Sequence, residues 1–205
     1  MKHKGKKKLL LLGSIIVTLV VAFIIVDSLY VNSSQTMADR VTLARNFEEL
    51  DSKSDLIVIA SVLPNKKNIL LTEDDGTVSF GYTLTQLSID KIFSGETSEK
   101  TITITEEYYV TDDIIGKTIW TQGEYQPAQV KSSYIFFLKK YDESTDYKGL
   151  YFPIDLEYGK YLIRNDIKNS IDKFTNKELE VGDKADARYR EWMKAVFKKY
   201  DVGSD

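Results

Sequence analysis

A long uncharged run near the N-terminus constrains this chain more than any other feature. It extends from Leu9 to Val26, and five lysines precede it within the first eight residues. A helix rises ~1.5 Å per residue and the hydrocarbon core of a bilayer is ~30 Å thick, so about 20 apolar residues span it. We therefore predict a transmembrane signal-anchor helix over residues 9–30; a helix buried inside a soluble protein is a further alternative.

The position of the lysines predicts the orientation of that helix. They flank only its N-terminal side, so residues 1–8 are expected in the cytoplasm and the rest of the chain outside. Residues 31–38 then form a polar linker, and residues 39–205 form one extracytoplasmic domain. The alternative is secretion after cleavage at Ser28 or Ala38. The run is longer than the ~7–15 apolar residues typical of a signal peptide, which favours a retained anchor.

Composition excludes several kinds of chemistry outside the membrane. The chain has no cysteine, and its one histidine is His3 in the predicted cytoplasmic tail. A Ser-His-Asp triad, a Cys-His pair and any metal site with His or Cys ligands are therefore not available to the domain. We expect no catalytic residue, no metal and no cofactor, and we expect that the protein is not an enzyme.

Carboxylates are the remaining candidates for chemistry. Glu106 and Glu107 precede the run YYVT, and paired carboxylates can hydrolyse glycosidic bonds when one is held protonated. The acidic residues 73–75 beside Gly76 do not match the spacing of a calcium loop. Solvated turns explain such acidic groups more simply. A carboxylate-dependent enzyme acting on the cell wall is therefore the alternative function.

The charge of the domain argues against nucleic acid as a partner. Five of the 28 basic residues and one of the 31 acidic residues precede residue 39, so the remainder carries a net charge of −7. Nucleic acids and anionic membrane surfaces both attract a net basic face. A cysteine-free exported domain rich in Lys, Ile, Tyr and Asn is typical of a Gram-positive source.

Apolar periodicity predicts a mainly β domain with a helix at each end. We expect the first helix over residues 37–50, capped by Thr36, and the last over residues 184–200, capped by Asp183. The expected strands lie in DLIVIASVL, in the segment 78–93, in TITITEE, in YIFFLKKY and, as a pair around Gly159, in KGLYFPIDLEYGKYLIRND.

The segment 78–93 changes the parity of its apolar residues. They stand at even positions in the first half and at odd positions in the second, namely Val78, Phe80, Tyr82, Leu84, Leu87, Ile89 and Phe93. A strand has a period of two, so this change predicts a β-bulge near Thr85 and Gln86. A bulge lets a strand coil into a closing sheet, and we expect a small barrel with the threonines turned outward.

Several of these segments resemble a known family. The order LARNFEELDSKSDLIVIASV, YTLTQLSIDKIFSGE, TITITEE and KSSYIFFLKKY, over residues 43–165, resembles exported bacterial domains of the netrin/TIMP-like kind. The resemblance implies an OB-like β-barrel that serves as a binding scaffold. This chain lacks the N-terminal cysteine by which the animal metalloproteinase inhibitors chelate metal, so that mechanism does not carry over.

Together these features predict a membrane-anchored binding or interaction module of the cell envelope. Its expected partner is a protein, a peptide or an envelope polymer, with Tyr109, Trp120 and Tyr125 forming an exposed binding edge. A structural subunit of a membrane complex is a further alternative, because Gly13, Ser14 and Thr18 would allow close packing of the anchor helix.

Overall fold

The computed structural model describes only part of the anchor region and nearly all of the rest. Described are residues 16–18, 20–22, 31–36, 44–113, 115–123, 125–168, 170–183, 185 and 187–202.

Most of the predicted anchor, residues 9–30, thus lies outside the described residues. Its described parts, 16–18 and 20–22, are helical, and the side chains of Ile16 and Val17 are more than half exposed. No helix within the described ranges is both long and apolar enough to cross a membrane.

The chain divides into two compact units, which are described separately. The first comprises residues 1–34 and 110–120, and the second comprises residues 35–109 and 121–205. A three-stranded sheet in the order β1–β6–β5 belongs mostly to the first unit. Its strands are β1 (Val31–Thr36), β5 (Tyr108–Asp112) and β6 (Lys117–Gln122).

This sheet includes residues of the expected linker. Residues 31–36, predicted as part of a linker, form β1 because the open edge of β6 offers backbone hydrogen bonds to an extended segment. The predicted cap Thr36 is also part of this strand. Residues 110–120 were expected inside the single outer domain, and they cluster with the first unit instead.

The second unit is built on a sheet of six strands in the order β2–β3–β4–β8–β7–β9. The strands are β2 (Leu56–Thr72), β3 (Val78–Ser94), β4 (Thr101–Glu106), β7 (Ser133–Lys140), β8 (Tyr151–Pro153) and β9 (Lys160–Leu162). β7 also pairs with β2, so the pairings that start at β2 and run through β3, β4, β8 and β7 return to β2. All of these pairings are antiparallel except that of β4 with β8.

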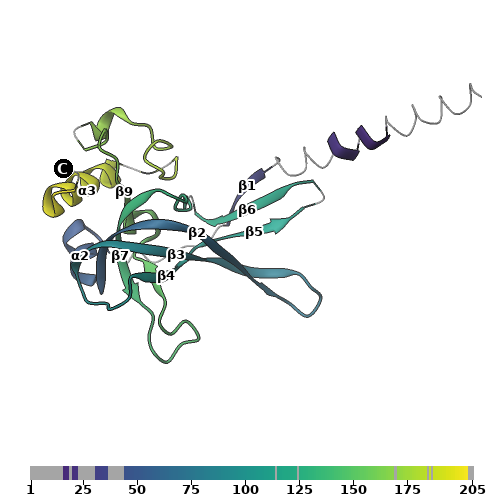
Figure 1. The fold of residues 1–205 in the computed structure, drawn as a ribbon, viewed down its shortest axis with the longest axis horizontal. Helices are drawn as coiled ribbons and strands as arrows, with labels where there is room; N and C mark the ends of the chain where they lie inside the picture. Colours follow the sequence, from purple (N-terminus) through teal and green to yellow (C-terminus); the bar gives the residue numbers. More distant parts are fainter. Residues whose placement is uncertain are drawn as a thin grey trace, which may run out of the picture. The chain divides into compact units, whose positions relative to one another are not determined.

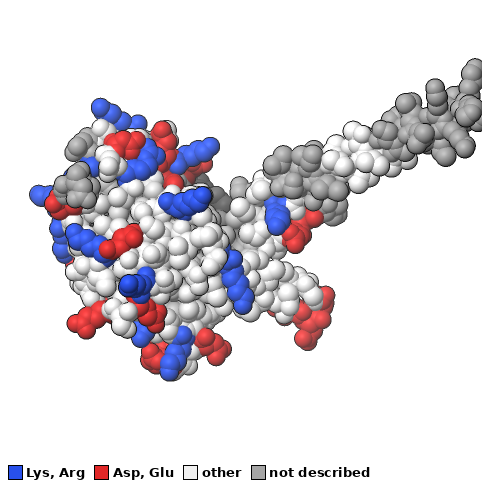
Figure 2. Space-filling view, viewed as in Figure 1, with Lys and Arg blue, Asp and Glu red and all other residues white. Residues whose placement is uncertain are grey.

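The long hairpin of β2 and β3 is the most extended feature of this unit (Figure 1). Its turn places Gly76 at φ +85°, as expected for the glycine of the TEDDG segment. Figure 2 shows the acidic side chains gathered at the tip of this hairpin, with a largely uncharged surface behind them.

The predicted bulge in β3 near Thr85 and Gln86 was wrong. Residues 83–88 of β3 pair with β4 without interruption. The irregularity lies in β2, where Val62 pairs with Leu87 and Lys66 pairs with Thr85, so three residues of β2 face one residue of β3. Pro64 lies in this irregular stretch, where its missing N–H costs no ladder hydrogen bond.

The threonines of β3 also point the other way from the prediction. Thr83 and Thr85 are buried, and Tyr82 and Leu84 on the opposite face are partly exposed. The inner face of the sheet is therefore apolar at Leu87 and becomes polar toward Thr83, while the outer face carries the even-numbered apolar residues.

Two helices accompany the sheet, as predicted, with shorter bounds. α2 (Phe47–Lys53) begins at the N-cap Asn46, whose side chain accepts a hydrogen bond from the backbone N–H of Glu49. The expected helix over residues 37–50 was therefore wrong at least for residues 44–46, because Asn46 is a strong N-cap and adopts an extended backbone. α3 is Ala187–Tyr200.

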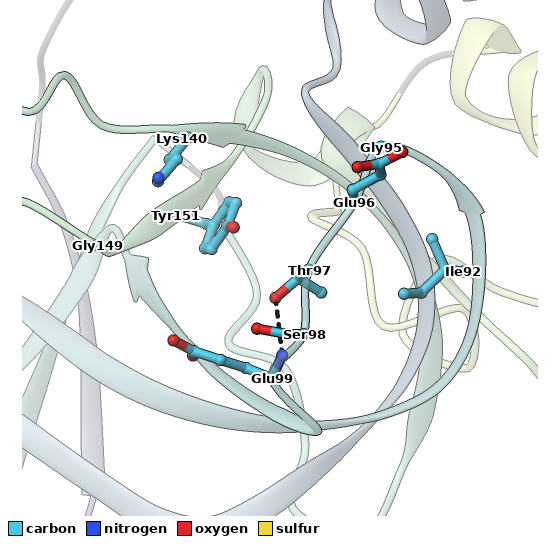
Figure 3. Close-up of a pocket in the computed structure, with 9 residues that line it drawn as sticks. All are labelled: Ile92, Gly95, Glu96, Thr97, Ser98, Glu99, Lys140, Gly149 and Tyr151. Carbon is cyan, nitrogen blue, oxygen red and sulfur yellow. Dashed lines mark hydrogen bonds between the residues drawn. The ribbon is translucent and has the colours of Figure 1, made fainter.

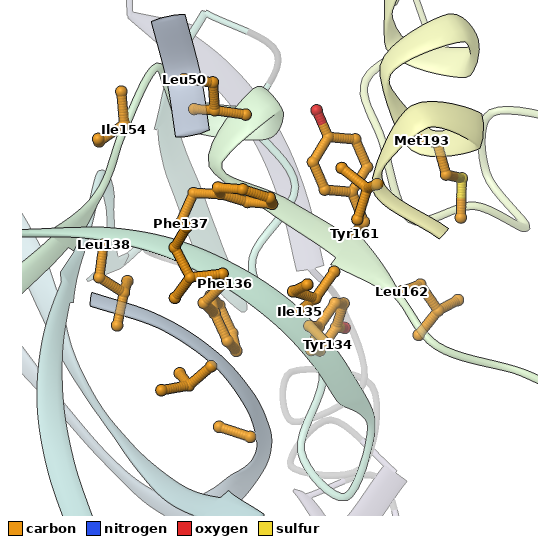
Figure 4. Close-up of a cluster of buried hydrophobic side chains, with 14 of the residues drawn as sticks. Leu50, Tyr134, Ile135, Phe136, Phe137, Leu138, Ile154, Tyr161, Leu162 and Met193 are labelled. Atoms are coloured by element: carbon orange, nitrogen blue, oxygen red, sulfur yellow. The ribbon is translucent and has the colours of Figure 1, made fainter. Parts of the chain in front are cut away.

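The buried face of α3 confirms the predicted apolar stripe. Its buried residues are Tyr189, Trp192, Met193, Val196 and Phe197. Figure 4 shows Met193 of α3 and Leu50 of α2 near the side chains of β7 and β9, including Phe137 and Tyr161. The rings of Phe137 and Tyr161 meet edge to face with centroids 6.0 Å apart.

The strands around Gly159 do not form the expected pair. β8 and β9 are joined by the short helix η1 (Leu156–Gly159), and both pair with β7, β8 at residues 138–140 and β9 at residues 134–136. A second short helix, η2 (Ile171–Lys173), lies in the connection to α3. Gly159 is required here because a Cβ would lie 2.3 Å from the carbonyl oxygen of Ile154.

Candidate functional site

A buried carboxylate occupies the polar end of the interior. Glu106 at the end of β4 is 0% exposed. Its Oε1 accepts hydrogen bonds from the hydroxyl of Tyr125 at 2.8 Å and from the backbone N–H of Ala128 at 2.7 Å. Its Oε2 accepts from the hydroxyl of Thr85 and from Nζ of Lys66 at 3.0 Å. These four donors use the accepting capacity of a carboxylate, which leaves no free oxygen for a substrate.

Lys66 neutralises this carboxylate from the irregular part of β2. Its Nζ also donates to the hydroxyl of Tyr108 at 3.1 Å and to the carbonyl oxygen of Ala128 at 2.6 Å. Burial lowers the pKa of Lys66, but the charge of Glu106 and the hydrogen bonds outweigh it, and the net shift is upward. The Lys66 side chain is thus held in its charged form.

Lys160 is a buried cation near this cluster. Its Nζ lies 5.3 Å from the ring centroid of Tyr125 and 5.2 Å from that of Tyr134, and it donates to the carbonyl oxygen of Glu180 at 3.3 Å. Burial lowers the pKa of Lys160 to about 8, although the charges of Glu106 and Glu180 oppose the shift. The fully buried carboxylate of Glu106 thus lies near one partly buried cation, Lys66, and one buried cation, Lys160, which also contacts aromatic faces.

The outer face of the second unit carries a row of aromatic rings, which we call the aromatic strip. It consists of Phe80 and Tyr82 on β3, Tyr141 and Tyr147 in the segment between β7 and β8, and Phe152 on β8. The ring centroids are 6.5 Å apart for Phe80 and Tyr82, 5.5 Å for Tyr82 and Tyr147, 4.9 Å for Tyr147 and Tyr141, and 4.7 Å for Tyr141 and Phe152.

The strip is hydrogen-bonded to the sheet near one end and exposed to solvent at the other. The hydroxyl groups of Tyr141 and Thr105 are 2.9 Å apart, which fixes one ring on the sheet. Phe80 is 49% exposed, and its cross-strand neighbour Leu71 is 45% exposed. Single exposed apolar side chains are ordinary, whereas a contiguous set of partly exposed rings is a candidate interaction surface.

Charged residues border the strip in the segment that holds Tyr147. Glu143 is neutralised by Lys140 at 3.1 Å and by Lys148 at 3.0 Å. Asp142 accepts hydrogen bonds from the backbone and side chain of Ser144. Asp146 is close enough to Tyr82 to affect its ionisation. Burial is the largest cause that raises the pKa of Tyr82, and the charges of the neighbouring tyrosines and of Asp146 add to it.

A polar pocket of about 670 Å³ lies next to the same segment. Figure 3 shows Thr97 and Glu99 of the β3–β4 loop on one side of it and Lys140 and Tyr151 on the other. Gly95 shapes the loop, because it has φ +80° and a Cβ there would lie 2.1 Å from the carbonyl oxygen of Asp55. Within the described ranges, no three His, Cys, Asp or Glu side chains are placed to share a metal ion.

The three predicted edge residues lie in different surroundings. Tyr125 is 1% exposed and donates to Glu106, so its ring is not part of an exposed edge. Tyr109 is partly exposed and covers Gly81, where a Cβ would meet its ring at 2.5 Å. Trp120 is partly exposed in the first unit, where its indole N–H donates to the hydroxyl of Thr111 at 2.8 Å.

The burial of Tyr125 has a physical cause. Its loop has the composition of a contact surface, yet the buried Glu106 needs donors, and a tyrosine hydroxyl supplies one at low entropic cost. The aromatic strip was missed because Tyr141, Tyr147 and Phe152 are not periodic. The even-numbered apolar residues of β3 were its visible signal in the sequence.

The comparisons with known proteins add no assignment. No protein-family model matches this chain, and no curated protein matches it either.

Proposed function

We propose that this protein is a binding module of the cell envelope, anchored in the membrane by residues 9–30, with the second unit outside the cell. The aromatic strip is its binding face, and the contiguous rings, exposed at Phe80 and partly exposed elsewhere, are the observation that carries the proposal. Rigid aromatic side chains supply contact area with little loss of conformational entropy, which is why they dominate binding surfaces.

The anchor rests on the charge pattern of the N-terminus. Five lysines precede the uncharged run, and the exposed apolar side chains at residues 16, 17, 20 and 21 suit a lipid environment. Secretion after cleavage remains the alternative. Both place the second unit outside the cytoplasm.

The scaffold we propose is an OB-type barrel of the netrin/TIMP-like kind. The return of the strand pairings to β2, the parallel pairing of β4 with β8 and the polar end at Glu106 support a sheet closed on itself. Such barrels bind on one face and in the adjoining loops, which suits the position of the strip.

A binding role explains the interior better than a carboxylate-dependent enzyme does. Glu106 was one of the two carboxylates considered for wall hydrolysis, and all of its accepting capacity is used inside the fold. A general acid or base must reach its substrate within hydrogen-bond distance.

The test is site-specific photocrosslinking in intact cells. A photoreactive phenylalanine derivative replaces Tyr147 or Phe80 on the strip, or Lys198 on the exposed face of α3 as the control. We expect a discrete adduct from the two strip positions and none from the control. Equal labelling at all three positions, or none on the strip, would contradict the binding role of this face.

Localisation is tested separately by protease treatment of wall-less cells. The second unit should be degraded while an N-terminal tag survives. A fully protected second unit would overturn the proposed orientation, whatever the crosslinking result.

A further inference from the structure

We propose that the aromatic strip binds an extended peptide segment with repeated lysine or arginine side chains, whose cations lie over the exposed rings. This inference rests on the proposed binding role of the strip and adds the chemical class of the ligand. It is carried by two independent observations, namely strip rings that carry no cation of this chain and carboxylates without a salt bridge in the segment that holds Tyr147.

The first observation is where this chain places its own cations. Lysine or arginine side chains lie within 6 Å of eight rings elsewhere in the described residues, for example Lys66 over Tyr108 and Arg188 over Tyr158. None of these contacts involves Phe80, Tyr82, Tyr147 or Phe152. The ring faces carry a negative quadrupole, so partly exposed rings without a cation from this chain attract a cation from another molecule.

The second observation is the balance of charge at the strip. Lys140 and Lys148 both bind Glu143, which leaves Asp142 and Asp146 without a salt bridge among the described residues. Asp142 is held by hydrogen bonds to Ser144. Asp146 is exposed and close enough to influence Tyr82. A carboxylate beside a ring face fixes a cation from two sides.

The same charges disfavour other occupants. A second copy of this chain would bring another acidic surface, since residues 39–205 carry a net charge of −7. Like charges across an interface are unfavourable. A neutral hydroxyl-rich polymer could also stack on tyrosine rings, but it would gain nothing from Asp146. The effect of Asp146 therefore separates a cationic ligand from a neutral one.

The probe is fluorescein-labelled hepta-lysine, titrated against the full-length chain in a neutral detergent and followed by fluorescence anisotropy. Labelled hepta-glutamate and labelled chitotetraose are the comparison probes. We expect saturable binding of hepta-lysine that weakens as salt rises from 50 to 300 mM, and no binding of hepta-glutamate.

Matched variants assign the binding to the strip. Tyr147→Leu and Phe80→Leu remove a π face while keeping an apolar side chain, and each should raise the Kd of hepta-lysine about threefold. Tyr147→Phe keeps the ring and should bind like the wild type. Asp146→Asn should weaken binding about threefold, whereas Glu191→Gln, the same charge change on α3, should leave it unchanged.

The results distinguish the binding role of the strip from the cationic nature of its ligand. Phe80 has a single ring neighbour and high exposure, so Phe80→Leu tests the strip even if Tyr147→Leu fails to fold. The proposal of a cationic ligand is contradicted if neither leucine variant changes the Kd of hepta-lysine. It is also contradicted if Asp146→Asn and Glu191→Gln change that Kd equally. Ring-dependent binding of chitotetraose alone would overturn it too, yet would leave the binding role intact. Loss of both the probe binding and the cellular adducts would remove the binding role as well.

Discussion

The hydroxyl of Tyr125 donates a 2.8 Å hydrogen bond to Oε1 of Glu106, and both residues are buried. This contact joins the loop that follows β6 to the end of β4. Burial and the neighbouring carboxylate raise the pKa of Tyr125 well above its usual value, so the phenol remains a donor at every pH the protein meets. The loop that holds Tyr125 has the composition of a contact surface, yet this hydrogen bond fixes it to the interior.

The first prediction concerns this buried cluster. Tyr125→Phe leaves Glu106 with one donor fewer and should lower the free energy of unfolding by about 1–3 kcal/mol. Glu106→Gln leaves Lys66 without its counter-charge and should cost about 3–5 kcal/mol. Urea unfolding of the full-length chain in mild detergent measures both. A Glu106→Gln variant as stable as the wild type would mean that the carboxylate is not the anchor of this network.

The second prediction concerns Lys160 and pH. Its pKa is about 8 in the folded protein and about 10.5 in the unfolded chain. The unfolded chain therefore binds more protons between these values, and stability must rise as pH rises through this window. Relative to Lys160→Met, the wild type should gain up to roughly 3 kcal/mol, most of it between pH 8 and 10.

The measurement is urea unfolding of both proteins from pH 7 to pH 10. Above pH 10 the buried tyrosines and Lys66 begin to titrate in the unfolded chain, which would obscure the effect. A difference between the two proteins that stays constant over this range would show that Lys160 keeps its ordinary pKa.

The third prediction compares two glycines with the same backbone conformation. Gly95 has φ +80° and Gly149 has φ +81°, so alanine is strained at either position by about 1–2 kcal/mol. A Cβ at Gly149 meets nothing within 4 Å, whereas a Cβ at Gly95 would lie 2.1 Å from the carbonyl oxygen of Asp55. Gly95→Ala should therefore lower the thermal midpoint clearly more than Gly149→Ala. Equal losses would mean that the loop shifts freely away from Asp55.

The fourth prediction concerns the packing of α3. Trp192 is 8% exposed and its ring centroid lies 4.9 Å from that of Tyr158. Trp192→Ala should destabilise the chain by about 3–5 kcal/mol, as for a large buried aromatic residue. Lys198→Ala on the exposed side of the same helix is the control and should change stability by less than about 0.5 kcal/mol. A small loss from Trp192→Ala would place that ring at the surface.

Strong local patterns allowed much of the second unit to be predicted from the sequence. The continuous apolar run of β2, the alternation of β4 and the stripe of α3 each follow one periodicity. Each is confirmed by the burial of Ile57, Ile104 and Met193. The turn at Gly76 was equally clear, because an acidic tip beside a glycine has few alternatives.

The wrong predictions for β3 arose because its threonines were assigned to the outer face of the sheet on polarity alone. Thr83 and Thr85 were expected outside, but they line a polar interior and donate to the carbonyl oxygen of Tyr108 and to Glu106. The change of parity in β3 therefore marks where the interior becomes polar and the outer face becomes apolar. Such a change depends on Lys66 and Glu106, which are distant in sequence and give no periodic signal.

The acidic tip of the β2–β3 hairpin has a consequence for solubility. From Lys66 to Thr72, β2 pairs only with β3 among the described strands, and Leu70 and Leu71 on this edge are exposed. An open apolar edge of this kind can recruit the same edge of another molecule and start aggregation. Glu73, Asp74 and Asp75 follow directly and are exposed, so two such edges repel each other before they can align. The acidic tip therefore opposes edge-to-edge aggregation. This repulsion should weaken at acidic pH or at high salt.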